Sequence, residues 1–276
     1  MSEKKSTAIA TIDNFQIVTG LEGMDPELLA ELQDEMEDLD EVKGISCKRI
    51  KIPSGGGKAF EVESDDNPDD PEIMKEIEAV IVFTHRMNSY WEDEFGSGDG
   101  AASVPECSSM DAKTGLNTST GEIRNCDTCP MNQFADDGSG KPCKNIRRLY
   151  LLISGHPGIY LLSVPPTSIR DVNKQLARIM GNNKVPYTCM VVRFKLDQAE
   201  NRNKIKYSKV TVEKAGMLPK EAWAQTVAMR RELKEKYKDI APDADDYSTS
   251  ESQSTQMPPI GSDEFMEVDP GEMPFA

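Results

Sequence analysis

The stretch Ile77-Glu78-Ala79-Val80-Ile81-Val82-Phe83-Thr84 decides the fold class of this chain of 276 residues. Its run of apolar, mostly β-branched side chains is typical of a strand buried inside a sheet. Flanking segments with the same character would be the partners of that strand. The body of the protein is therefore expected to be built as a sheet around this stretch.

Strand patterns lie on both sides of the central stretch. Residues 45–52 and 58–62 surround a Ser-Gly-Gly-Gly turn, and residues 148–154 and 158–164 form a second pair. About five to seven short strands with few helices predict a mainly β (α+β) fold, an OB-like partly open β-barrel. The other expected elements are a helix over residues 167–181, a hairpin of residues 187–196 and 205–212, and a flanking helix over residues 220–239.

Composition divides the chain into three parts. Residues 1–43 are interpreted as an N-terminal lead-in and an acidic helix with Asp25 as its N-cap. Residues 44–239 are expected to form the OB-like domain. Residues 240–276 are rich in Asp, Ser, Thr, Gln and Pro, so they cannot bury enough apolar surface to offset the entropy of ordering. We expect this acidic tail to be disordered.

Within the domain, residues 92–146 form an insertion with almost no apolar periodicity, which is implausible in a compact domain unless something organises it. The insertion holds Cys107, Cys126, Cys129 and Cys143 in the pattern Cys-x18-Cys-x2-Cys-x13-Cys. Four thiolates suit tetrahedral Zn²⁺, and a closed shell leaves no position open for a substrate. The sequence therefore predicts a zinc-ribbon-like insertion with a structural zinc that contributes on the order of 10 kcal/mol to folding.

Other interpretations of the cysteines stay open. Unrelated free cysteines, an iron–sulfur cluster or a redox Cys-x-x-Cys pair would use the same residues. His85 or His156 could also replace one ligand. The two remaining cysteines, Cys47 and Cys189, fall within strand patterns and are predicted to be small core residues.

The charge of the chain is segregated along the sequence. The formal net charge is −16, which taken alone argues against nucleic-acid binding. However, residues 138–238 hold 21 Lys/Arg against 7 Asp/Glu, whereas residues 240–276 hold nine acids and no base. Further acidic blocks cover residues 22–41 and 61–78. A basic body between acidic arms favours binding of a polyanion.

Single-stranded nucleic acid is held by cations along its backbone and by aromatic rings that stack on its bases. For any single residue, a solvated surface cation or a core aromatic is the more common explanation. The clustering of many such residues is what favours binding. The candidates are Arg86, Tyr90 and Trp91, then Lys141, Lys144, Arg147, Arg148 and Tyr150, and on the expected hairpin Arg193, Lys195, Arg202, Lys204, Lys206 and Tyr207.

The C-terminus combines acids with sparse apolar residues, as a docking peptide does. It resembles the tail of bacterial single-stranded DNA-binding proteins, whose polar linker ends in an acidic tip closing with Pro-Phe. The resemblance implies recruitment of replication and recombination proteins through the tail, and a plain solubilising tail is the alternative. The matching residues are Asp269, Glu272, Met273, Pro274 and Phe275, and this chain adds Ala276.

A metal-bearing insertion inside an OB-like body is similar in plan to the zinc-containing single-stranded DNA-binding protein of T-even phages and to the zinc-bearing domain of the eukaryotic replication protein. Residues 126–134 (CDTCPMNQF), 140–145 (GKPCKN) and 147–150 (RRLY) also look like segments of proteins from bacterial phages and mobile elements. These resemblances imply a sequence-independent single-stranded DNA-binding protein in a phage or plasmid context, with RNA as the other strand to consider.

Catalysis is not expected. The chain has no Walker loop, no Gly-x-Ser-x-Gly and no His-Glu-x-x-His motif, and its two histidines leave few options for a histidine-based mechanism. No apolar run approaches the length of a membrane span, and the N-terminus lacks the apolar stretch of a signal peptide. We expect a cytoplasmic protein of a bacterial cell or phage-infected host. The alternative function is a zinc-ribbon adaptor or transcription regulator that binds protein or duplex DNA.

Overall fold

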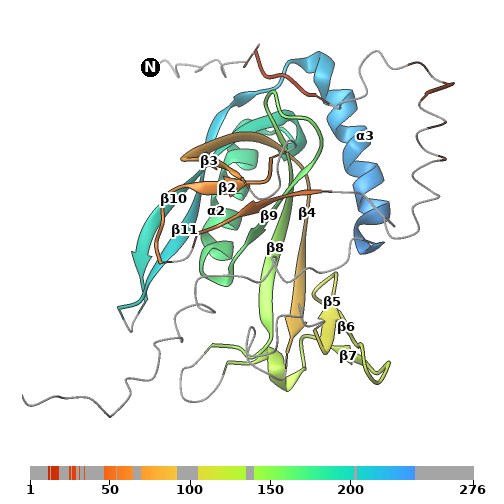
Figure 1. Cartoon of the computed structure of the whole chain (residues 1–276), viewed down its shortest axis with the longest axis vertical. Coiled ribbons are helices and arrows are strands. Elements are labelled where there is room, and N and C mark those ends of the chain that lie inside the picture. Colours follow the sequence, from red (N-terminus) through yellow and green to blue (C-terminus); the bar gives the residue numbers. More distant parts are fainter. Residues whose placement is uncertain are drawn as a thin grey trace, which may run out of the picture.

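The structure is a computed structural model of the chain, and it describes residues 12, 14–18, 25, 27–28, 31, 34, 47–53, 55–64, 70–91, 105–134, 140–201 and 204–239. This part is mainly β, with a mixed sheet that does not close and two long helices (Figure 1). The predicted α+β class is confirmed at this level. The acidic tail lies outside the described residues, as does most of the acidic lead-in.

The central strand is β4 (Glu76–Tyr90), which contains the stretch that the sequence singled out. Its residues from Ala79 to Phe83 are all buried, because layers cover both faces of the sheet at this point. β4 pairs antiparallel with β10 (Met190–Glu200) near its start, with β8 (Lys144–Ile153) along most of its length, and with β5 (Cys107–Ser109) at its end.

The rest of the sheet extends from these strands in two directions. Beyond β8, a parallel pairing joins β9 to β1, so the sheet is mixed. Beyond β5 the order continues through two short antiparallel strands of the cysteine-bearing segment. The order is β3 (Glu72–Met74), β2 (Phe60–Val62), β1 (Lys48–Lys51), β9 (Tyr160–Val164), β8, β4, β5, β6 (Thr114–Asn117) and β7 (Ile123–Asn125), and β11 (Lys206–Met217) pairs with β10.

Each long helix covers one apolar cluster of the sheet. α2 (Pro166–Asn183) starts on a proline, which fits the first turn of a helix, and buries Val172 and Leu176 in one cluster. α3 (Lys220–Lys236) buries Leu233 in the other cluster and stands beside β4 (Figure 1). Three single turns complete the described elements: η1 (Pro130–Asn132), η2 (Tyr187–Cys189) and η3 (Tyr237–Asp239).

Several details of the sequence prediction can be compared with this structure. The side chain of Asp25 accepts a hydrogen bond from the backbone N–H of Glu27 at 2.8 Å, as expected of an N-cap. Cys189 is a buried core residue, as predicted, and Cys47 is half-buried against the α3-side cluster. β4 and β8 run farther than predicted, because Asn88 and Ser89 are polar in sequence yet buried in the sheet. Neither α2 nor α3 has both the length and the apolar character that crossing a membrane requires, and the described residues offer no other helix that does.

Candidate functional site

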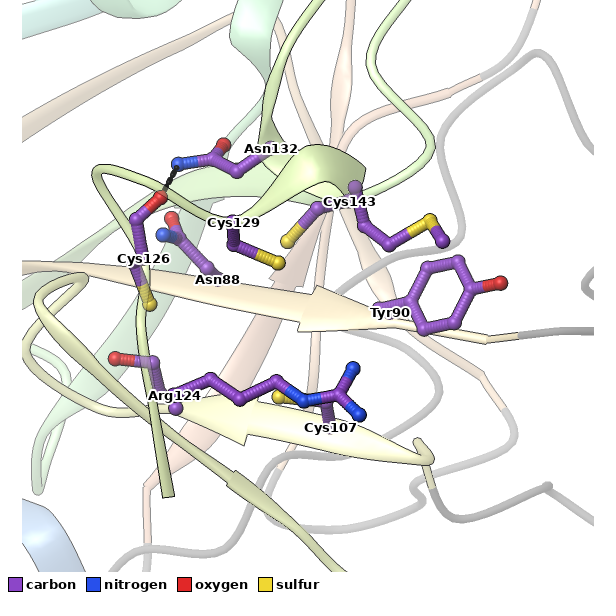
Figure 2. A pocket seen from close by; sticks show the side chains of 11 residues that line it. Asn88, Tyr90, Cys107, Arg124, Cys126, Cys129, Asn132 and Cys143 are labelled. Atoms are coloured by element: carbon purple, nitrogen blue, oxygen red, sulfur yellow. Dashed lines mark hydrogen bonds between the residues drawn. The ribbon is translucent and has the colours of Figure 1, made fainter. Parts of the chain in front are cut away.

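The four cysteines of the predicted zinc pattern converge on one small cavity (Figure 2). Cys107 lies on β5, Cys126 follows β7, Cys129 precedes η1, and Cys143 precedes β8. Cys107 pairs with Tyr90 of β4, and Ser89 of β4 pairs with Lys144 of β8, so these strands bring Cys107 and Cys143 close together. Asn88 and Tyr90, at the end of β4, line the same cavity.

Backbone hydrogen bonds hold the turns that carry the cysteines. The amide of Cys126 donates to the carbonyl of Lys113, and that of Cys143 donates to the carbonyl of Met131, both at 2.8 Å. The side-chain amide of Asn132 donates to the carbonyl of Cys126 at 2.7 Å, as the dashed line in Figure 2 shows. The Cys-x-x-Cys turn is therefore tied to both of its flanks.

Gly115 on β6 lets two of the sulfurs approach each other. A Cβ atom at this position would lie 2.9 Å from Sγ of Cys107 and 3.6 Å from Sγ of Cys126. The two sulfurs are therefore no farther apart than the sum of these distances. A side chain at position 115 would compete with them for the same space.

The thiols also affect each other electrostatically. Burial, and then the neighbouring thiols of Cys126, Cys107 and Cys129, raise the pKa of Cys143 to about 12. Burial, followed by Cys126 and Cys129, raises the pKa of Cys107, and the Arg124 guanidinium opposes this rise. Four thiolates in such a cavity repel one another unless a cation neutralises them.

Four cysteines that line one cavity do not yet form a complete set of ligands around a metal ion. Within the described ranges, no set of three or more His, Cys, Asp or Glu side chains is already placed to hold one metal ion. Lining a cavity requires only that the sulfurs face it, whereas coordination requires each Zn–S distance to be about 2.3 Å. The structure thus brings the four predicted ligands together, and the zinc itself stays a prediction.

A larger groove of about 760 Å³ lies next to the cysteine cavity. It is bounded by the segment between Cys129 and β8, by the ends of β4 and β8, by the start of α2 and by β11. Its charged lining is mostly basic, with one carboxylate at Asp127. We call this feature the basic groove, with the cations Arg86, Lys141, Lys144 and Arg170 and the rings of Phe134 and Tyr207 in its lining.

The four groove cations keep their charge available. Among the residues that the structure describes, none of them forms an ion pair, although Lys141 makes a long hydrogen bond to Asn132 at 3.4 Å. Arg86 also lies directly opposite Arg147 across the β4–β8 pair. Burial, and then the charge of Arg86, lower the pKa of Arg147. Two cations in direct cross-strand register repel each other, so an anion beside them would stabilise the pair.

Cations of the β10–β11 hairpin are in a different situation. Both guanidinium Nε and Nη2 of Arg193 donate to Glu78, and Lys195 lies 3.2 Å from Glu213. These two candidates are therefore neutralised in place. Lys204 and Lys206 are exposed at the end of the hairpin, and Tyr207 reaches the basic groove. Arg202 lies outside the described residues.

The candidates closest to the cysteines divide by burial. Arg148 and Tyr150 are both 0% exposed, so they cannot touch a bound strand, and we correct the prediction by removing them from the candidate set. Trp91 packs against Met87 and Ile146, and Tyr90 faces the cysteine cavity. Both rings are half-buried and belong to the neighbourhood of the cluster rather than to the basic groove.

Phe134 and Arg170 are groove residues that sequence reasoning missed. The Phe134 side chain is 74% exposed, and the ammonium of Lys141 lies 5.1 Å from the centre of its ring. The signal that could have found it is an isolated aromatic next to cations in a segment without apolar periodicity, where no core is available to bury it. Arg170 had no sequence signal, because only the fold places the first turn of α2 beside the cysteine segment.

Comparisons of the chain with family models, with curated proteins and with solved structures gave no match.

Proposed function

We propose that this protein binds single-stranded nucleic acid, primarily DNA, in the basic groove and without sequence preference. The observation that carries the proposal is the groove itself: four cations that form no ion pair within the described part of the chain, two aromatic rings and one carboxylate line a single cavity. Cations along the groove would contact backbone phosphates, and rings would stack on bases. The protein would serve replication or recombination as an OB-like binding module without catalysis.

The rings favour an unpaired strand over a duplex. Stacking needs a base whose face is open, and bases within a duplex are already stacked on their neighbours. The exposed ring of Phe134 and the half-buried ring of Tyr207 contribute from different elements of the groove lining. A volume of about 760 Å³ also lies in the range that encloses small ligands, which suits a few nucleotides of a longer strand.

The proposal includes one structural Zn²⁺ on Cys107, Cys126, Cys129 and Cys143. Support comes from their convergence on one cavity and from the raised thiol pKa values of Cys107 and Cys143, to which the neighbouring thiols contribute and which a bound cation would relieve. We expect metal analysis to give one zinc per chain. Cys126→Ser should lose it and unfold the insertion, whereas Cys189→Ser, at a buried position of η2 away from the cluster, should keep it.

The acidic tail is proposed to recruit replication and recombination proteins in the cytoplasm of a bacterial or phage-infected cell. This part of the proposal is supported by sequence alone, through the acids Asp269 and Glu272 and the apolar residues Met273, Pro274 and Phe275. Their separation from the basic body by a polar linker would let one molecule hold a strand and a partner at the same time.

One observation favours the adaptor function as a second candidate. Leu116 and Ile123 face each other in register on β6 and β7 and are 48% and 71% exposed. An exposed apolar pair on the edge strand β7 and its neighbour β6, next to the cysteines, would suit a protein partner. This surface lies outside the lining of the basic groove, so the two candidates can be tested separately.

The test compares two pairs of cations. The double variant Arg86→Ala/Lys144→Ala removes groove charges, and the control Lys195→Ala/Lys209→Ala removes the same number of charges that are already paired with Glu213 and Asp171. We expect the groove variant to weaken binding of oligo-dT and to reduce the salt slope by about 0.7 for each lost phosphate contact. The control should change little. Equal effects of the two pairs would show that net charge, and not the groove, determines binding.

A further inference from the structure

The cysteine cavity and the basic groove share a wall. Asn88, Asn132 and Cys143 line both of them. The same segment, between the second and the last cysteine, also supplies Phe134 and Lys141 to the groove. The ring and one of the cations that the proposed function uses are therefore carried by the loop that the cysteines close.

This wall has little apolar packing of its own. Of its described side chains, only Cys126 and Cys143 are buried, and η1 contains no buried residue. A segment without a core depends on other constraints to stay ordered. In this segment the cysteine cluster can act as such a constraint. A metal bound there would fix both ends of the segment.

A chain of side-chain amides connects the two cavities. The amide of Asn145 donates to Oδ1 of Asn88 at 2.7 Å and to Oδ1 of Asn132 at 3.0 Å. Asn132 in turn donates to the carbonyl of Cys126 at 2.7 Å and accepts from the ammonium of Lys141 at 3.4 Å. Asn132 is thus a positioning residue between the cysteine cluster and the groove cation Lys141.

We infer that metal loading of the four-cysteine cluster controls the basic groove, so that the Zn²⁺-loaded protein holds a single strand and the metal-free protein holds it poorly. The inference rests on the proposed function, because it states how that same groove is regulated. A metal held by the four cysteines would draw their sulfurs together, and the segment between Cys129 and Cys143 would then keep Phe134 and Lys141 at the groove. Without the metal, the wall keeps only its hydrogen bonds.

The first test uses the full chain and Zn²⁺ alone as the metal. Oligo-dT affinity is measured for the protein loaded with one equivalent of zinc, after a chelator has removed the metal, and after zinc has been restored. We expect a loss of at least tenfold that zinc restores, while the thermal transition of the main sheet stays cooperative. Equal affinity with and without zinc overturns the inference and leaves the proposed function intact. No strand binding in any state overturns the proposed function.

Two variants test the route of the coupling. Gly115→Ala places a Cβ 2.9 Å from Sγ of Cys107, so it should weaken zinc and strand binding together, whereas Gly181→Ala on α2 meets no atom within 4 Å and should change neither. Asn132→Ala should keep zinc, measured by metal analysis, yet bind oligo-dT several-fold more weakly. Wild-type strand affinity in Asn132→Ala, or in a Gly115→Ala protein that has lost its zinc, contradicts the coupling.

Discussion

Phe134 is a side chain whose exposure has no structural benefit. A phenylalanine that is 74% exposed leaves apolar area in water that burial would have stabilised. Its position in the lining of the basic groove, with the Lys141 ammonium over the ring, matches what a stacking platform for a base requires. Among single residues, Phe134 therefore gives the strongest support for the proposed binding of a single strand.

We expect Phe134→Ala to weaken oligo-dT binding by roughly tenfold, since base–aromatic stacking contributes about 1–3 kcal/mol per base. Its free energy of unfolding should hardly change, because the ring is exposed. Ile123→Ala is the matched control: this side chain is 71% exposed and lies outside the groove. Fluorescence anisotropy with labelled oligo-dT measures both variants. The assignment is wrong if the two substitutions weaken binding to the same extent.

The imidazole of His85 makes the free energy of unfolding depend on pH. Burial, and then the charges of Arg148 and Arg147, lower its pKa to about 4, although backbone hydrogen bonds oppose the shift. Its Nδ1 donates to the carbonyl of Met110 at 2.9 Å, and Nε2 accepts from the Tyr150 hydroxyl at 3.2 Å. In the unfolded chain the pKa returns to about 6.5, so protonation then favours the unfolded state.

Above pH 6.5 the ring is neutral in both states, and the folded protein has its full stability. As the pH falls from about 6.5 to about 4, the free energy of unfolding should decrease, by about 2 kcal/mol at pH 5. Urea unfolding at pH 7 and pH 5 measures the free energy of unfolding at each pH. In His85→Gln this free energy should decrease less between pH 7 and pH 5 than in the wild type.

The sequence predicted which cysteines lie together better than it predicted the cations of the groove. Cysteine spacing identified the four residues that line one cavity, because a Cys-x-x-Cys pair brings two thiols to one tight turn. Cations carry no such spacing. Arg193 is neutralised because the β4–β10 register places it opposite Glu78, and Arg148 is buried because its strand is covered; both facts depend on tertiary structure.

At the scale of elements, the β10–β11 hairpin projects two exposed cations, Lys204 and Lys206, from its end. If a bound strand continues beyond the groove past Tyr207, these cations would contact further phosphates. Charge reversal, Lys204→Glu/Lys206→Glu, should then reduce the salt slope of oligo-dT binding by about 0.7 per lost contact. A short oligonucleotide that fills only the groove should show no change. An unchanged slope with long strands would remove the hairpin from the binding surface.

Elements with a clear apolar pattern were predicted, as were the short strands β1 and β2, whereas β3 and the strands of the cysteine-bearing segment were not. The central stretch follows from its continuous run of apolar residues, and α2 and the hairpin strands follow from apolar periodicity, which indicates a face buried against a partner. β3 and the strands β5, β6 and β7 are three or four residues long. Strands that short have no readable period, and turns and neighbouring strands determine where they form.

At the scale of the whole molecule, the charge is arranged as a basic body with acidic ends. Residues 240–276 hold nine acids and no base. Removing them should preserve or tighten strand binding, because an acidic competitor for the cations is gone, while recruitment of partner proteins should be lost. Oligo-dT titration of the truncated and full-length chains tests the first expectation. Weaker binding by the truncated chain would contradict it.

The central claim is that the basic groove holds an unpaired strand through phosphate contacts and base stacking. The most direct measurement is a fluorescence titration of the zinc-loaded protein with oligo-dT and with a duplex of the same length, each at two salt concentrations. The account predicts tighter binding of oligo-dT than of the duplex, with an affinity that falls as salt rises. A preference for the duplex, or no binding of either nucleic acid at low salt, would contradict it.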